Sequence, residues 1–269
     1  MRIWDVTNGF TLKRSIDAIP QEDLNFVEWH SQAPVLMTGG KDYMIWLVNA
    51  VNGKVMANMI GHEEEVLSAQ FTKEDRGKHI VSCSADKSLK VWSPLTSECV
   101  VTLKSYGSGS KKEFHESQIL CFALHPEMPV ILSGDEDGRV FASQYMTGEI
   151  NGVIGTHTDS VESIAISQTQ PIACSAGIDS KIHVYDLTNF TKRLTVQVGQ
   201  FGGFTKLLFS TFNTNVLIAA STLGDVSLVD PRNGEVLKTI KGHIASVNDI
   251  KEFKLEDGSL MLATAGDDN

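Results

Sequence analysis

Hydrophobic and polar residues alternate along short segments of this chain, and Gly, Asn, Asp and Pro separate the segments. Alternation of this kind places one side of a segment in a core and is typical of β-strands, particularly where β-branched and aromatic residues are frequent. Residues 80–92 show the pattern clearly, because two alternating stretches flank a turn at Asp86. The sequence therefore predicts an all-β fold.

The turn at Asp86 recurs along the chain with nearly constant spacing. Its copies lie at Asp42, Asp86, Asp137, Asp179, Leu223 (a degraded copy) and Asp268. The period is about 44 residues, which indicates β-propeller blades of four strands each. Because a blade buries its faces only against its neighbours, the repeats predict one propeller domain over residues 1–269.

The predicted strands form five complete units between two incomplete ones. Residues 2–16 supply two strands, and residues 247–266 supply two more. We expect these pairs to complete one blade, which would give six four-stranded blades in a closed ring without open sheet edges. The alternative is a fragment of a longer ring, interrupted within a repeat at both ends. A Gly-, Ser- and Lys-containing insertion at 106–117 predicts a surface loop.

The composition narrows the class of partner. The chain has 33 acidic and 23 basic residues and a formal net charge of -10. This charge disfavours nucleic acid or an anionic membrane as the main partner and favours a basic protein. The sequence shows neither a membrane-spanning apolar run nor a secretory leader. Its four cysteines lack metal-ligand spacing, so we expect reduced thiols, no cofactor, and a cytoplasmic or nuclear location.

Several residue pairs recur in register with the turns and resemble the WD-repeat family. They are Gly61–His62 upstream of Trp92, Gly242–His243, and Trp4–Asp5. The resemblance implies a β-propeller in which a His, a Ser or Thr, the turn Asp and an aromatic residue form a hydrogen-bonded chain inside a blade. The expected members are His62, Ser82, Asp86 and Trp92 and, in a softer copy, His157, Ser175, Asp179 and Tyr185.

His, Ser and Asp in one repeat also match the composition of a hydrolase triad. Because the set recurs at the repeat period, we interpret it as structural and predict that the protein is not an enzyme. The histidines are not spaced as zinc ligands, and the chain contains no phosphate-binding G-x-x-x-x-G-K-[ST] loop.

A narrower resemblance rests on Glu28-Trp29-His30 and the Ala-Pro-Val-Leu stretch at 33–36. Residues 25–53 are similar to the corresponding blade of the angio-associated migratory cell protein group. That group includes the fungal WD-repeat chaperone dedicated to one basic large-subunit ribosomal protein. The resemblance implies a protein-binding chaperone in ribosome biogenesis, and we expect it to be monomeric.

In a WD propeller, the connectors between blades share one rim with the turn between the second and third strands. The sequence places a surplus of carboxylates on this rim: Glu22, Asp23, Glu63, Glu64, Glu65, Asp135, Glu136, Asp159 and Asp267. A ring of like charges attracts an oppositely charged segment. We therefore predict that this rim binds a basic ribosomal protein. The alternatives are a general scaffold in signalling or trafficking, and a rim that serves solubility only.

Overall fold

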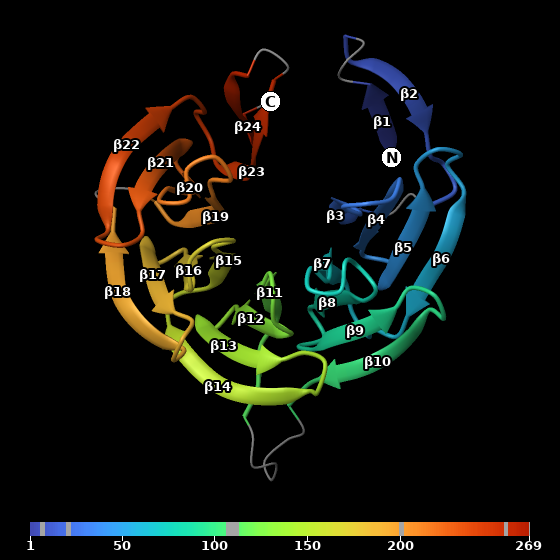
Figure 1. Ribbon diagram of the computed structural model, residues 1–269, viewed down its shortest axis with the longest axis horizontal. Coiled ribbons are helices and arrows are strands. Elements are labelled where there is room, and N and C mark those ends of the chain that lie inside the picture. Colours follow the sequence, from blue (N-terminus) through green and yellow to red (C-terminus); the bar gives the residue numbers. More distant parts are fainter. Residues whose placement is uncertain (6–8, 20–22, 106–112, 199–201, 256–257, 269) are drawn as a thin grey trace.

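The computed structural model describes residues 1–5, 9–19, 23–105, 113–198, 202–255 and 258–268. All regular elements among these residues are β-strands, and they are arranged as blades around a central axis (Figure 1). The all-β propeller that the repeats predict is confirmed.

Five blades have four strands each. The first has β3 (Leu24–Trp29), β4 (Val35–Gly40), β5 (Met44–Asn49) and β6 (Val55–Ile60). The second has β7 (Val66–Phe71), β8 (Ile80–Ser84), β9 (Leu89–Ser93) and β10 (Glu98–Leu103). The third has β11 (Ile119–Leu124), β12 (Val130–Asp135), β13 (Arg139–Gln144) and β14 (Glu149–Thr156).

The fourth blade has β15 (Val161–Ile166), β16 (Ile172–Gly177), β17 (Lys181–Asp186) and β18 (Thr191–Gln197). The fifth has β19 (Phe204–Phe209), β20 (Leu217–Ser221), β21 (Asp225–Asp230) and β22 (Glu235–Lys241). Within each blade, every strand pairs antiparallel with the next strand of the chain. The first strand of each blade lies nearest the axis and the fourth lies at the periphery (Figure 1).

The core lies between blades. One buried cluster joins Cys174 and Val184 of the fourth blade to Phe204 and Leu207 of the fifth. Another joins Val91 of the second blade to residues of the third, including Phe141. The two alternating faces of each sheet are thereby both covered, and the burial of apolar area between blades is the main stabilising force.

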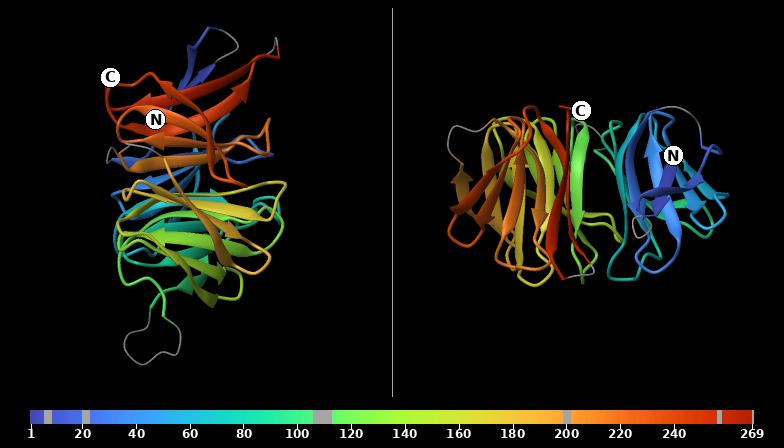
Figure 2. Two further views of the ribbon diagram at one scale, coloured as in Figure 1. Left: turned by 90° about the vertical axis from the view of Figure 1, so that its left-hand side faces the viewer. Right: turned by 90° about the horizontal axis from the view of Figure 1, so that it is seen from above.

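The two ends of the chain do not complete a common blade. β1 (Arg2–Asp5) pairs with β2 (Thr11–Ser15), and β23 (Val247–Lys254) pairs with β24 (Leu260–Gly266), as two separate sheets. An opening in the ring separates them (Figure 1; Figure 2 gives two further views). The expected closure of a sixth blade is therefore corrected by the structure.

The physical reason lies in the packing of each pair. Apolar residues near the first pair, including Ile16, pack on Leu36 and Val48 of the first blade. Val247 and Ile250 of β23 pack on the fifth blade. Each pair is thus held by the face of its neighbouring blade, and the curvature of the array keeps the two edges apart.

Candidate protein-binding face and central channel

One face of the propeller carries both the connectors between blades and the turns between second and third strands. Backbone N–H groups of the turns donate to the connectors, as in Ala85 to Glu65 (3.0 Å), Ile178 to Ser160 (3.1 Å) and Asp267 to Ser246 (3.0 Å). Antiparallel strands place the other two hairpin turns of each blade at the opposite end. We call the first face the turn face and the second the far face.

In the second blade, four buried side chains form a continuous chain of hydrogen bonds beneath the turn face. The Trp92 Nε1–H donates to Ser82 Oγ (2.8 Å), and Ser82 Oγ lies 2.7 Å from His62 Nε2. His62 Nδ1 lies 2.8 Å from Asp86 Oδ2. A neutral His62 with its proton on Nδ1 lets every group donate to the next, so the polar groups are paired inside the sheet.

Asp86 also organises the turn and the connector. Its carboxylate accepts the backbone N–H groups of Glu63 (3.0 Å) and Ser88 (2.9 Å). Burial alone would raise the pKa of Asp86, but the hydrogen bonds from His62 and Ser88 outweigh it and hold the pKa well below its ordinary value. The ionised carboxylate is therefore part of the fold.

The fourth blade repeats the arrangement with a tyrosine. His157 Nδ1 lies 2.9 Å from Asp179 Oδ1, and His157 Nε2 lies 2.7 Å from Ser175 Oγ. The Tyr185 hydroxyl lies 2.8 Å from Ser175 Oγ and takes the place of the indole N–H. Burial lowers the pKa of His157 more than Asp179 raises it, which favours the neutral imidazole.

Two further networks escape the sequence reasoning. In the third blade, His115 lies 2.7 Å from both Asp135 Oδ2 and Ser133 Oγ. In the C-terminal pair of strands, His243 lies 2.6 Å from Asp268 Oδ1 and 2.8 Å from Thr264 Oγ1. The signal for His115 was available, because His115 precedes Ser133 by the same 18 residues that separate His157 from Ser175.

The structure corrects the role expected for Asp135. Its side chain is fully buried and accepts hydrogen bonds from the backbone N–H and the Nε–H of Arg139 (2.8 and 3.0 Å) in addition to contacting His115. An interior carboxylate with these partners cannot meet a protein that docks on the rim. Asp137, which the repeat spacing marks as the turn residue, lies on the surface and contacts Arg139 instead (3.4 Å).

These networks support the sheet rather than present a reactive group. Ser82, Ser133 and Ser175 have no exposed surface. The hydroxyls of Ser82 and Ser175 are each held between the histidine and the aromatic residue of the same blade. Among the described residues, no group of three or more His, Cys, Asp or Glu side chains is placed to hold a metal ion, and no helix is long and apolar enough to span a membrane.

Comparison with known proteins agrees with this architecture. The family model described as "WD domain, G-beta repeat" matches residues 53–93, 108–141 and 148–186. This chain carries WD repeats. It is 27% identical to the angio-associated migratory cell proteins of Homo sapiens and Canis lupus familiaris, over 99% of this chain and 61% of each relative.

A more distant relative is an uncharacterized WD repeat-containing protein of Schizosaccharomyces pombe. It is 26% identical over 71% of this chain and 48% of its own length. The chain therefore spans about three fifths of the mammalian relatives and about half of the fission-yeast one. WD-repeat propellers generally act as protein-interaction scaffolds.

The predicted acidic residues have different environments on the WD propeller. Glu64, Glu136 and Asp159 are exposed on the turn face, and none of the three forms an ion pair within the described part of the chain. Asp267 is exposed and accepts a hydrogen bond from Asn248 (2.5 Å). Glu22 lies outside the described residues.

The remaining acidic residues of the rim are partly neutralised. Asp23 pairs with Lys41 (2.7 Å), and Glu63 pairs with Lys104 (3.3 Å). Glu65 is half-buried and accepts a hydrogen bond from the Asn25 side chain (3.3 Å). The turn face keeps an acidic surplus, but the carboxylates that are open to a partner are fewer than the sequence alone indicates.

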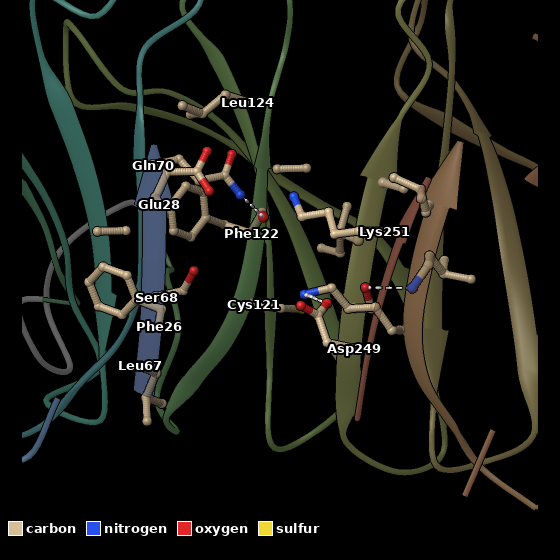
Figure 3. A pocket seen from close by; sticks show the side chains of 18 of the residues that line it. Phe26, Glu28, Leu67, Ser68, Gln70, Cys121, Phe122, Leu124, Asp249 and Lys251 are labelled. Atoms are coloured by element: carbon tan, nitrogen blue, oxygen red, sulfur yellow. Dashed lines mark hydrogen bonds and ion pairs between the residues drawn. The ribbon is translucent and has the colours of Figure 1, made fainter. Parts of the chain in front are cut away.

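A channel of about 1010 Å³ runs along the axis, between the first strands of the blades. Because side chains alternate along a strand, the third and fifth residues of each first strand point toward the axis. Figure 3 shows Phe26, Ser68, Cys121 and Asp249 at one level, and Glu28, Gln70 and Lys251 at the next. The sequence reasoning missed these charged channel residues, although their strand positions could have revealed them.

Proposed function

We propose that this WD-repeat propeller captures a basic segment of a protein partner on its turn face. The single observation that supports the proposal is the distribution of exposed carboxylates: Glu64, Glu136 and Asp159 come from consecutive blades and face solvent on the same side. None of them is neutralised by a lysine or arginine among the described residues. A partner's ammonium or guanidinium groups would supply the missing counter-charges.

The proposed client is a basic protein of the large ribosomal subunit, held before its assembly. The similarity of the Glu28-Trp29-His30 stretch to the ribosomal-protein chaperone group favours this client over other basic proteins. The carboxylates would substitute for the rRNA phosphates that the client meets later. They would act chiefly on the rate of encounter, because charges at a solvated rim steer association more than they stabilise the complex.

The test combines three charge reversals, because a single exposed charge contributes little. We expect the triple variant Glu64→Lys, Glu136→Lys, Asp159→Lys to reduce the association rate with a fluorescein-labelled Lys- and Arg-rich peptide by on the order of tenfold at low salt. The difference should shrink at physiological salt, where the screening length is about 8 Å. Stopped-flow anisotropy measures both rates.

The matched control reverses three exposed carboxylates of the far face, Glu98, Glu127 and Glu235. It makes the same change in net charge and should alter the association rate much less. Equal loss from both faces would show that only net charge matters, and capture on the turn face would be abandoned. Affinity purification followed by mass spectrometry tests the client: large-subunit ribosomal proteins should be retained by the wild type and lost with the turn-face variant.

A further inference from the structure

The two ends of the channel differ in charge. Near the turn face, the channel is lined by Glu162. The Lys206–Asp249 ion pair (3.3 Å) lies next along the axis. Toward the far face the first strands present Glu28 and Lys251, and Lys73 joins these from the loop after β7. The far end therefore contains two ammonium groups and one carboxylate.

The side-chain ammonium groups of Lys73 and Lys251 form no ion pair or hydrogen bond among the residues that the structure describes. Lys206, by contrast, has its own counter-ion in Asp249. Figure 3 shows Glu28 and Lys251 reaching into the channel from different strands, at one level. The two lysines thus share a single carboxylate, which leaves one positive charge without a partner.

The surroundings affect the pKa values of two of these three groups. Removal from water raises the pKa of Glu28, even though Lys251 and Lys73 act in the opposite direction. The same removal from water lowers the pKa of Lys73, against the effect of Glu28 and together with that of Lys251. Lys73 and Lys251 are nevertheless exposed and Glu28 is half-buried, so these charges lie at a solvated channel mouth. The surplus positive charge attracts an added carboxylate there, and water screens part of that attraction.

The opposite wall leaves room for a ligand. The third and fifth residues of β11 and β15 are Cys121, Ala123, Ser163 and Ala165, all small and all part of the channel lining. A volume of about 1010 Å³ lies at the upper end of the range that binds compact ligands, roughly 300–1,000 Å³. An extended polypeptide segment would run along this wall with one end at the lysines.

We propose that the far end of the channel binds a carboxylate of a partner polypeptide between Lys73 and Lys251. The polypeptide enters from the far face and lies extended along the small residues of β11 and β15. The site goes beyond the proposed capture of a basic segment, because it involves no turn-face carboxylate and selects the opposite charge. Two sources of the carboxylate are open to test: the C-terminus and an Asp or Glu side chain.

The experiment uses the full chain and three fluorescein-labelled hexapeptides of Gly and Ser. The first ends in Asp-Asp with a free C-terminus, the second ends in Asn-Asn with a free C-terminus, and the third is the second with an amidated C-terminus. We expect the first to bind and the third not to bind. Binding of the second near the level of the first would assign the carboxylate to the C-terminus; loss of that binding would assign it to the side chain.

Variants then test the residues. Lys73→Gln and Lys251→Gln should each weaken binding of the Asp-Asp peptide by about two- to fivefold, as expected for the loss of one exposed ion pair. Glu28→Gln should strengthen binding several-fold, because it removes a repulsive carboxylate from the site. A gain on this substitution cannot come from damage to the fold, so it keeps the test informative if a lysine variant is unstable.

Lys87→Gln and Lys241→Gln are the matched controls, because both lysines are exposed on the turn face. They should leave peptide binding unchanged. Absence of binding to the wild type, equal binding of the amidated peptide, or equal losses from the turn-face lysines would each overturn the proposal. None of these outcomes bears on the turn-face carboxylates, whose triple variant should bind the Asp-Asp peptide as the wild type does.

Discussion

The second and fifth blades have the same four-stranded sheet, but their interiors differ. The second contains the chain from Trp92 through Ser82 and His62 to Asp86. In the fifth, the register places Ala219 where the second blade has Ser82, and the degraded turn copy Leu223 stands where Asp86 would be. The comparison shows that the polar network is one way of fixing a blade and is not a requirement of the fold.

The fifth blade has apolar packing and a local polar contact in place of the network. Phe204 and Leu217 have almost no exposed surface and lie in one cluster with Val184 and Val196 of the preceding blade. The Ser221 hydroxyl accepts the backbone N–H of Asp225 (3.2 Å) and so ties the turn locally. In the fifth blade, apolar contact with the preceding blade is therefore the main source of stability. In the second blade, packing and the hydrogen-bonded network both contribute.

The largest effect should therefore come from the core of the fifth blade. Phe204→Ala removes a buried ring between two blades and should lower the free energy of unfolding by about 3–5 kcal/mol, the usual cost of such a cavity. Chemical denaturation monitored by circular dichroism measures it. Phe10→Ala, at a ring that is 70% exposed, is the control and should cost little. Similar losses from both would mean that packing does not hold the fifth blade.

A second test uses the pH dependence of stability, which should depend on a buried histidine in a blade that contains a network. In the fourth blade, His183 stacks on His157 with ring centroids 4.0 Å apart. Burial, then the neighbouring His157 and Lys192, lower the pKa of His183 to about 4. The unfolded chain binds this proton near pH 6.5, so stability is present above pH 6.5 and is lost as pH falls toward 4.

The expected loss between pH 7 and 4 is roughly 3 kcal/mol from this residue. His115 and His157, whose pKa values burial also lowers, add to it in the same direction. Urea unfolding at several pH values should show a shallower slope for His183→Gln than for the wild type. Parallel slopes would mean that the His183 pKa is ordinary in the folded protein.

The propeller and the networks of the second and fourth blades were predictable because a repeat shows itself through spacing. In the third blade the spacing of His115 and Ser133 could have been recognised, but the carboxylate could not, since the spacing marks Asp137 while the carboxylate that reaches His115 belongs to Asp135 at the end of β12. Arg139 contacts both carboxylates, and Asp135 is the one that turns inward to His115. A single aligned position does not contain that information.

Whether the ring closes could not be predicted from the sequence, for a different reason. Counting strands gives the number of hairpins, but the angle between adjacent blades follows from the side chains between them, such as Phe204 and Val184. The sign of the charge on the rim was predictable, but the number of unpaired carboxylates was not. Ion pairs such as Lys104–Glu63 join residues that are distant in sequence and neutralise some of these carboxylates.

The smallest effect isolates the network itself. Asp86→Ala leaves His62 and the backbone N–H groups of Glu63 and Ser88 without their acceptor. We expect a loss of about 1–3 kcal/mol in the free energy of unfolding, the cost of buried polar groups left unpaired. Leu223→Ala, at the corresponding position of the fifth blade, is the matched control.

Leu223 is more than half exposed, so its truncation should change stability by less than about 0.5 kcal/mol. The two variants together measure what the polar chain adds to a blade whose sheet is otherwise the same. If Asp86→Ala costs no more than Leu223→Ala, apolar packing alone holds the second blade as well. The hydrogen-bonded chain would then serve to fix the shape of the turn face, where the exposed Glu63 and Glu64 follow His62, rather than to stabilise the sheet.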